Sequence, residues 1–181
     1  MDISLKPAIT EDQLFHLEQL YIEAFPAAER KPFPLLLEKS RQGQTELLCM
    51  HLPDGEFAGL AIMVVHRGIA LLDYFAVSPA LRGKGVGSQA LHALMARYKG
   101  DIFLLEIETT LAPAEDAAIR LSRKNFYLRA GLTPLPWEIV LFGVRMEVLT
   151  DGTYVEFDDY HRVYRDNFGE DIAKKITLFE K

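Results

Sequence analysis

One stretch of the sequence decides the fold, and it reads Leu72-Asp73-Tyr74-Phe75-Ala76-Val77-Ser78-Pro79-Ala80-Leu81-Arg82-Gly83-Lys84-Gly85-Val86-Gly87-Ser88. Residues 69–77 are apolar almost throughout, which is typical of a central strand covered on both faces. Ser78-Pro79 ends this strand. A glycine-rich turn over 82–87 then leads into a helix that stops at Gly100, and its apolar residues recur at helical spacing. A buried strand, a turn and an amphipathic helix in succession predict an α/β domain.

Upstream of this stretch, the sequence predicts two helices and a hairpin. Thr10 through Gln13 matches a capping box, and apolar residues then recur at helical spacing. A second short helix opens at Pro32. The period changes to that of strands over 46–52 and 56–65. Asp54-Gly55 between them is a strong hairpin signal.

Downstream, the pattern predicts a buried strand over 102–107, a helix over 113–130, and closing strands over 132–136 and 138–149. Residues 151–181 carry 5 basic and 8 acidic side chains, with Tyr160, Val163 and Tyr164 at helical spacing. We therefore expect a three-layered α/β domain over 1–150. A helical extension over 151–181 should pack on the same domain through its aromatic stripe.

Composition and charge exclude several classes of protein. The chain has 181 residues, of which 49% are hydrophobic and 25% charged, and this composition excludes disorder. The formal net charge of −6 disfavours a nucleic-acid partner, because Lys and Arg on phosphates supply much of that affinity. Cys49 is the single cysteine, so an intrachain disulfide is excluded, and we expect it to be a buried spectator.

We expect neither a membrane segment nor a metal site. The N-terminus lacks the basic start and apolar stretch of a secretory signal. The most apolar run, Phe57 to Val65, is nine residues long, whereas a membrane-spanning helix needs about 20. A cytoplasmic protein is therefore expected. The five histidines show no metal-ligand spacing, and we infer no metal.

The glycine-rich turn has the features of an anion-binding site. The first N–H groups of a helix have no internal acceptor, and the helix dipole adds partial positive charge there. Glycines let a phosphate approach the backbone closely, and Arg82 and Lys84 add two cations. The sequence contains no P-loop string. A dinucleotide fingerprint is half matched by Gly83, Gly85 and Ser88, but strands that look antiparallel precede it. A nucleotide cofactor is therefore the weaker alternative, as is a merely solvated loop.

A second block of sequence carries a resemblance together with the first. The first block has the pattern Arg-x-x-Gly-x-Gly between a strand and a helix, and the second is Asn125-Phe126-Tyr127-Leu128-Arg129-Ala130-Gly131-Leu132. In this order, over roughly 45–149, the blocks resemble those of the GNAT (GCN5-related N-acetyltransferase) superfamily. The resemblance implies a GNAT-type three-layer αβα fold with a mixed, mostly antiparallel central sheet and, here, a C-terminal helical appendage.

The resemblance also implies acetyl-CoA as the co-substrate. Backbone amides of the turn would hold its pyrophosphate, and they belong to Arg82, Gly83, Lys84, Gly85, Val86, Gly87 and Ser88. The backbone of Phe75, Ala76 and Val77 would pair with the pantetheine arm. Tyr127 would protonate the departing thiolate, and Asn125 is a further candidate for contact with the coenzyme. Two departures from the family are Leu132 in place of Phe and about nine extra residues near 109–117, whose path stays open.

Transfer to an amine also requires a base, because an alkyl ammonium has a pKa of about 10.4. Glu106 and Glu108 lie two apart and hence on one face of the predicted strand. The resemblance favours Glu106, which follows Leu105 on this strand. Glu108 and Asp73 are alternatives, and a structural ion pair with Arg120 or Arg123 is the non-catalytic interpretation.

These observations predict an N-acetyltransferase that acts by direct attack on acetyl-CoA within a ternary complex. The acceptor would be a primary amine of a small molecule or peptide, and a homodimer is left open. A catalytically silent acyl-CoA-binding module is the alternative function. Several side chains are candidates for walls of the acceptor pocket or for core: Phe25, Glu29, Phe33, Trp137 and Phe142.

Overall fold

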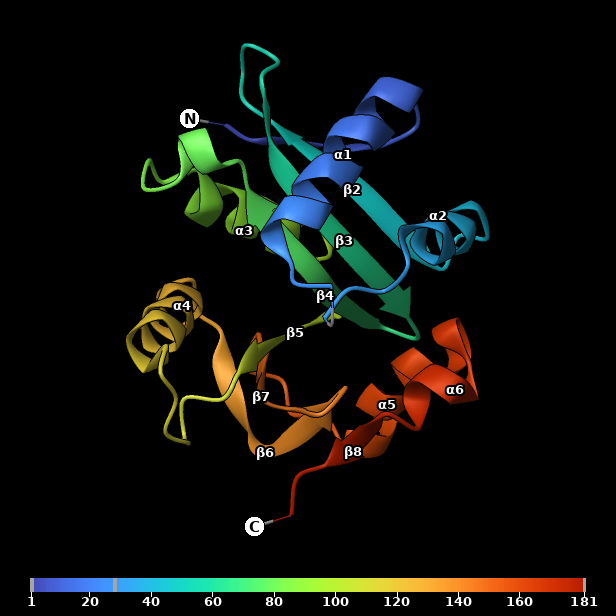
Figure 1. Cartoon of the computed structure of the whole chain (residues 1–181), viewed down its shortest axis with the longest axis vertical. Helices are drawn as coiled ribbons and strands as arrows, with labels where there is room; N and C mark the ends of the chain where they lie inside the picture. Colours follow the sequence, from blue (N-terminus) through green and yellow to red (C-terminus); the bar gives the residue numbers. More distant parts are fainter. Residues whose placement is uncertain (1, 28, 181) are drawn as a thin grey trace. The chain divides into compact units, whose positions relative to one another are not determined.

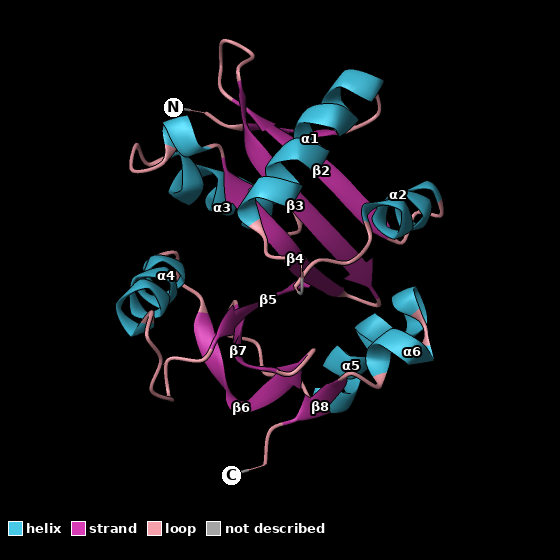
Figure 2. Ribbon diagram, in the orientation of Figure 1, coloured by secondary structure: helices cyan, strands magenta, loops and turns pink. Residues whose placement is uncertain are grey.

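The computed structural model describes residues 2–27 and 29–180, and their helices and strands are shown in Figures 1 and 2. The chain divides into two compact units. The first comprises Met1–Val65 and Leu72–Lys99, and the second comprises His66–Leu71 and Gly100–Lys181. The second unit therefore contains residues 151–181 together with the segment that precedes them.

The first unit holds most of the predicted N-terminal elements. Its strands lie in the order β1 (Ser4–Pro7), β2 (Thr45–His51), β3 (Phe57–His66) and β4 (Ile69–Val77). Its α-helices are α1 (Glu11–Ala24), α2 (Phe33–Arg41) and α3 (Val86–Arg97), and a 3-10 turn covers Pro79–Leu81. The pairs β1–β2 and β2–β3 are antiparallel. The short edge strand β1 was not predicted, because four residues ending in a proline carry little strand signal.

The start of α1 follows from its capping residues. The Gln13 amide donates to Thr10 Oγ1 at 3.2 Å, and the Thr10 amide donates to Gln13 Oε1 at 3.1 Å. Both bonds of the predicted capping box are therefore present. In Figure 1 this helix crosses in front of β2, β3 and β4.

Alternation along the strands places α1 and α3 on opposite faces of this sheet. Cys49 of β2 lies toward α1, where its Sγ is 3.6 Å from the Gln13 carbonyl oxygen. Met50, the next residue, packs with Val86 and Ala90 of α3. Neighbouring residues of a strand point to opposite faces, so helix, sheet and helix form three layers within this unit. The α/β fold with a mostly antiparallel sheet is confirmed.

A glycine brings β3 close to the end of β4. A Cβ on Gly59 would lie 2.2 Å from the Ala76 carbonyl oxygen and 2.3 Å from Met50 Cε. The Ser78 amide then donates to the Ala58 carbonyl at 2.9 Å. Any side chain at Gly59 would push the end of β4 away, so this glycine helps to position the strand that enters the glycine-rich turn.

The second unit contains the C-terminal elements. Its strands lie in the order β5 (Ile102–Glu108), β7 (Val144–Thr150), β6 (Thr133–Leu141) and β8 (Ile176–Leu178), and all these pairs are antiparallel. Its helices are α4 (Ala117–Arg129), α5 (Phe157–Phe168) and α6 (Glu170–Ala173). Tyr160, Val163 and Tyr164 of α5 are fully buried. The aromatic stripe that the sequence indicated is thus part of the core of this unit.

Two predicted boundaries in this unit were wrong. The closing hairpin turns at Phe142-Gly143 rather than near residue 137, and both turn residues have positive φ, +49° and +87°. Trp137 continues β6, and the glycine at the true turn was the missed signal. The helix predicted from 113 begins at Ala117, after a turn. Residues 151–181 were expected to be helical, yet β8 adds a strand that pairs with β6.

Among residues 2–27 and 29–180, none of the helices combines the length and the apolar character needed to cross a bilayer.

Candidate active site

The glycine-rich turn presents a row of unengaged backbone amides. Gly83 and Gly85 have φ of +75° and +82°, and α3 begins directly after Gly85 without a side-chain cap. The amides of residues 83–88, called here the turn amides, donate to no acceptor among the described residues, and the first amide of the helix that does is Gln89, to the Gly85 carbonyl at 3.2 Å. Six consecutive donors at a helix N-terminus suit an anion.

Arg82 differs from the residues that follow it. Its amide donates to the Pro79 carbonyl at 3.3 Å, and its side-chain Nε donates to the Val77 carbonyl at 3.1 Å. Arg82 is therefore tied to the end of β4, so its own amide is engaged. Lys84 and Ser88 are exposed within the row. The donor set that remains, six amides and the Lys84 ammonium, fits a diphosphate.

The three β4 residues proposed to contact the pantetheine arm lie just before this turn. Phe75 and Val77 are partly buried against the cluster formed by Val86 and Ala90 of α3, whereas Ala76 is buried. Packing on α3 thus fixes the end of β4 relative to the first turn of that helix, and the two predicted coenzyme-binding segments adjoin each other in the first unit.

Asp73 forms a buried ion pair in the first unit. Both of its oxygens accept from Lys31 Nζ at 2.8 Å, and the two side chains are only 4% and 3% exposed. The Tyr74 hydroxyl accepts from the Lys31 amide and donates to the Glu29 carbonyl, each at 3.0 Å. This network holds the segment between α1 and α2 against β4, which favours a structural role for Asp73.

Glu108 is also paired with cations. Its two oxygens lie 3.1 Å from Arg120 Nη2 and 2.8 Å from Arg123 Nη1, both on α4. The ion pair that the sequence left open for this strand is therefore made by Glu108. Both oxygens of Glu108 are thus engaged by guanidinium groups of α4, which favours a structural role for this side chain.

Glu106 accepts hydrogen bonds of another kind. The hydroxyls of Tyr160 and Tyr164 donate to the same oxygen, Oε1, at 2.8 and 2.9 Å. Glu106 lies near the middle of β5, opposite Val148 of β7. The sequence analysis predicted that both tyrosines belong to an aromatic stripe that packs on the domain, but it did not predict that they contact a candidate catalytic residue. Their spacing of four on one helix face was the available signal.

Tyr127 is a buried residue of α4, and burial raises the pKa of its phenol to about 12. The nearby Arg123 guanidinium lowers this pKa only in part. Its ring meets that of Phe126 edge to face, with centroids 5.0 Å apart. The phenol is therefore protonated at neutral pH, as a proton donor must be. Asn125 is exposed on the same helix.

The extra segment after β5 is bound to the neighbouring strands. The Thr109 hydroxyl donates to Glu138 at 2.7 Å, and the Thr110 amide and hydroxyl both donate to Glu147 at 2.7 Å. Lys124 of α4 also pairs with Glu147. Burial by itself raises the pKa of Glu147, but the hydrogen bonds from Lys124 and Thr110 outweigh it and hold this pKa below its ordinary value. The path left open for 109–117 is thus fixed at its start.

Helices α4 and α5 contact these strands through different carboxylates. Lys124 of α4 contacts Glu147, whereas the α5 tyrosines contact Glu106. Glu147 is opposite Ile107 in the register, and Ile107 is the neighbour of Glu106 on β5. Helix α4 therefore carries Tyr127 and the cations that pair with Glu108 and Glu147, whereas α5 carries the two phenols that donate to Glu106.

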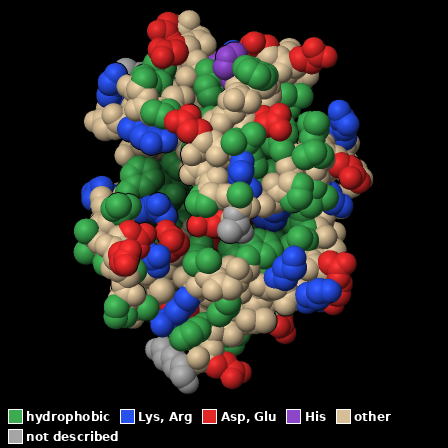
Figure 3. Space-filling view, viewed as in Figure 1, with side chains coloured by type: hydrophobic (Ala, Val, Ile, Leu, Met, Phe, Trp, Pro, Cys, Tyr) green, Lys and Arg blue, Asp and Glu red, His purple; other side chains and the backbone are tan. Residues whose placement is uncertain are grey.

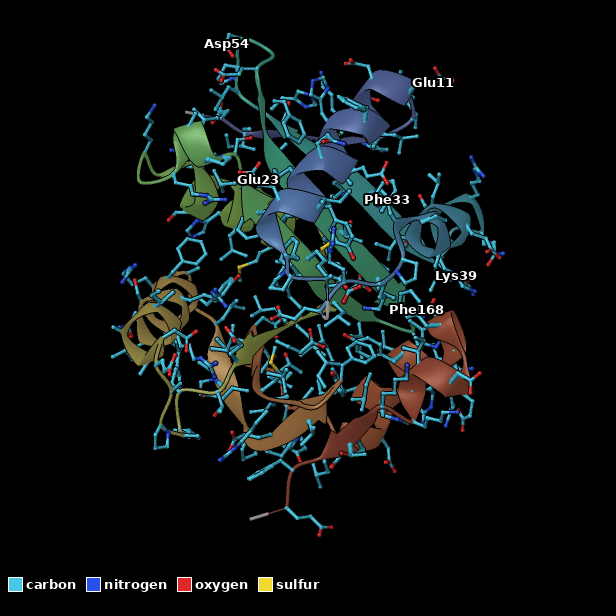
Figure 4. The ribbon with its side chains drawn as sticks, viewed as in Figure 1. Glu11, Glu23, Phe33, Lys39, Asp54 and Phe168 are labelled. Carbon is cyan, nitrogen blue, oxygen red and sulfur yellow. The ribbon has the colours of Figure 1, made fainter. Side chains whose placement is uncertain are left out.

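The side chains that the sequence analysis named as candidates for the wall of an acceptor pocket lie in different parts of the fold. Phe25 and Phe33 pack around Tyr21, with centroids 5.7 and 5.9 Å away, and Figure 4 labels Phe33. Trp137 donates its indole N–H to the Val155 carbonyl at 3.0 Å and so supports the start of α5. Phe142 lies in the turn between β6 and β7. Glu29 accepts through its backbone carbonyl.

Acidic and basic side chains are interspersed on the face of the molecule that Figure 3 shows.

Within the described residues, no group of three or more His, Cys, Asp or Glu side chains is arranged to hold a metal ion.

Comparison with known proteins agrees with the motifs. The family model described as "Acetyltransferase (GNAT) family" matches residues 14–126, which is more than half of the chain. A search of curated proteins finds no match. Among solved structures, a Bacteroides thetaiotaomicron protein assigned to the GNAT family is similar, with 23% identity, a TM-score of 0.73, and coverage of 92% of this chain and 98% of that one.

Two structures with the coenzyme bound share the fold at lower identity. The Vibrio cholerae spermidine N-acetyltransferase, in complex with CoA and spermine, has 10% identity and a TM-score of 0.64 over 82% of this chain and 94% of that one. A Bacillus subtilis acetyltransferase in complex with CoA has 16% identity and a TM-score of 0.55 over 82% and 96%. On the family match and the two motif blocks, the chain belongs to the GNAT family of acetyltransferases.

Proposed function

We propose that this protein transfers the acetyl group of acetyl-CoA to a primary amine of a small molecule or peptide. The observation that carries the proposal is the row of six turn amides, which have no acceptor among the described residues. Main-chain donors at a helix N-terminus bind phosphate without needing a large basic surface, which suits a chain of net charge −6.

Acetyl-CoA, when bound, supplies an activated acyl group with a thiolate leaving group. Glu106 accepts one proton from the acceptor ammonium, directly or through water, and frees the nitrogen lone pair. The carbon–nitrogen bond forms as the carbon–sulfur bond breaks, and the electron pair leaves on sulfur. Tyr127 donates its proton to that sulfur, and the second amine proton passes to solvent. Glu106 then releases its proton to solvent, and Tyr127 takes one up from solvent, so both residues return to their starting states. The products are the amide and free CoA thiol.

Direct attack is favoured over a covalent enzyme intermediate. Cys49, the single cysteine, is fully buried, and burial raises the pKa of its thiol to about 11. A buried neutral thiol is a poor nucleophile. A ternary complex in which the amine attacks the thioester therefore remains the proposed mechanism.

The acceptor is proposed to be cationic. The net charge of −6 attracts amines in general, and the similar fold of a spermidine N-acetyltransferase supports amines as a class to test first. A cytoplasmic location and a homodimer stay predictions.

A thiol-release assay tests the proposal. The purified protein is incubated with acetyl-CoA and, separately, with polyamines, aminoglycosides, amino acids and peptides. We expect amine-dependent thiol release and an acetylated product by mass spectrometry. Glu106→Gln is the matched variant, and it should lose most of the release while retaining the coenzyme.

Two other results would contradict the proposal. Binding of acetyl-CoA without thiol release for any amine would favour the silent acyl-CoA-binding module. Thermal stabilisation by NAD and none by CoA would favour a nucleotide cofactor, because a ligand raises stability in proportion to RT ln(1 + [L]/Kd).

A further inference from the structure

Helix α5 presents two tyrosines to one carboxylate oxygen. Tyr160 and Tyr164 are four residues apart, so they lie on the same face of the helix. Both are 0% exposed, and both hydroxyls donate to Glu106 Oε1, at 2.8 and 2.9 Å. Two buried phenols thus donate to one carboxylate oxygen. Packing of an aromatic helix face on the core would not by itself require both hydroxyls to meet the same acceptor.

The rings are held in place by an aromatic row made of Trp137, Tyr160, Tyr164 and Phe168. Successive ring centroids are 5.6, 5.7 and 6.0 Å apart. Trp137 is fixed in turn by its bond to the Val155 carbonyl at 3.0 Å. Figure 4 labels Phe168, which follows Tyr164 in the row. Packing on both sides limits the rotation of each tyrosine, so the hydroxyls are preorganised.

The two hydrogen bonds have a chemical consequence for the carboxylate. Each donor stabilises the ionised form of Glu106 over the protonated form, because the protonated acid is a weaker acceptor. Two donors on Oε1 also fix the rotation of the carboxylate. A proton acceptor must be ionised before the reaction and aimed at the acceptor amine during it.

We infer that Tyr160 and Tyr164 are positioning residues for Glu106, which they keep ionised and oriented as the base. The inference rests on the proposed function and deepens it. It makes the C-terminal segment, which the sequence presented only as a docked extension, part of the catalytic apparatus of the second unit.

The test is the pH profile of kcat/KM for Tyr160→Phe, Tyr164→Phe and the double variant. Phenylalanine keeps each ring and removes only the hydroxyl. In the double variant, the acidic limb of the profile should move upward by about one pH unit, so that kcat/KM on that limb falls about tenfold. The basic limb, which reports the acceptor amine, and the KM for acetyl-CoA should stay unchanged. Each single variant should show a smaller shift in the same direction.

Tyr154→Phe is the matched control. Its hydroxyl also belongs to the C-terminal segment, but it donates to Glu156 at 3.2 Å, and the side chain is exposed. This variant should have the wild-type profile. Thermal unfolding of every variant shows whether the fold is kept, and the single variants carry the test if the double variant is unstable.

A double-mutant cycle separates this inference from the proposed function. In the Glu106→Gln background, adding Tyr160→Phe and Tyr164→Phe should change the remaining rate no further, because their effect passes through the carboxylate. If Glu106→Gln abolishes the acidic limb while the tyrosine variants keep the wild-type profile, the positioning role of the tyrosines is wrong, but the assignment of Glu106 as the base is kept. If Glu106→Gln itself keeps the wild-type profile, both the base and the inference are wrong.

Discussion

Tyr127 shows how one side chain acquires a chemical state from its surroundings. It is buried on α4, and desolvation raises the pKa of its phenol to about 12. Because burial disfavours the phenolate, the hydroxyl stays protonated at every pH below this value. The proposed donor therefore stays protonated at every pH up to the pKa of an alkyl ammonium, about 10.4.

Tyr127→Phe should lower kcat by about 10²-fold and leave the Kd for acetyl-CoA unchanged, because only the proton donor is lost. Steady-state kinetics and calorimetric titration with acetyl-CoA measure the two quantities. Tyr98→Phe is the control, since Tyr98 is also buried but lies at the end of α3. An unchanged kcat would remove Tyr127 from the mechanism. In the wild type, no loss of rate from this phenol should appear below about pH 11.

At the scale of elements, the connection between β4 and α3 does more than reverse the chain. Left-handed φ angles at Gly83 and Gly85 turn the chain so that the turn amides precede the helix without internal acceptors. Packing of Phe75 and Val77 against Val86 fixes the strand end on the same helix. These features support the proposed anion site, which is built from backbone geometry that glycine adopts without strain.

Gly85→Ala tests this element. A Cβ there meets only Gln89 Nε2, at 3.8 Å, so the cost is backbone strain at φ +82° rather than a clash. We expect a stability loss of about 1 kcal/mol and roughly tenfold weaker acetyl-CoA binding, as the amides lose their alignment. Gly43→Ala has the same strain at φ +72° with open space around it. It should lose similar stability and bind acetyl-CoA normally, whereas equal weakening in both variants would contradict an anion site at residues 83–88.

At the scale of the whole molecule, the C-terminal 31 residues raise the question of where the domain ends. They lie in the second unit, where Tyr160, Val163 and Tyr164 are fully buried and β8 pairs with β6. A peripheral appendage would bury few side chains completely. The proposed boundary, a domain over 1–150 with 151–181 packed on it, therefore needs a direct test.

Removal of residues 151–181 should abolish cooperative unfolding, because it exposes the apolar surface that α5 covers and opens the edge of β6. Circular dichroism during heating and binding of a hydrophobic dye measure both effects. A truncated chain that unfolds cooperatively near the wild-type temperature would show that 1–150 is complete without the extension.

Several residues show which features of the fold and of the candidate site could be predicted from the sequence. The capping box at Thr10, the hairpin at Asp54-Gly55 and the strand-turn-helix at 69–97 were confirmed, because each depends on neighbours in the chain. The turn at Phe142-Gly143 was misplaced, since its glycine stands between apolar residues on both sides and does not interrupt their pattern clearly. The partners of Glu106 and Asp73 were missed altogether, because they lie 54, 58 and 42 residues away.

The sequence by itself determined the order of elements, the glycine-rich turn before a helix, and membership of a family through two motif blocks. These are local properties: apolar spacing, glycine φ and short patterns act over a few residues. Only the tertiary structure decided which carboxylate meets which group, with Asp73 on Lys31, Glu108 on two arginines and Glu106 on two phenols. Three acidic side chains look alike in a sequence, and their chemistry differs because folding surrounds each with different donors.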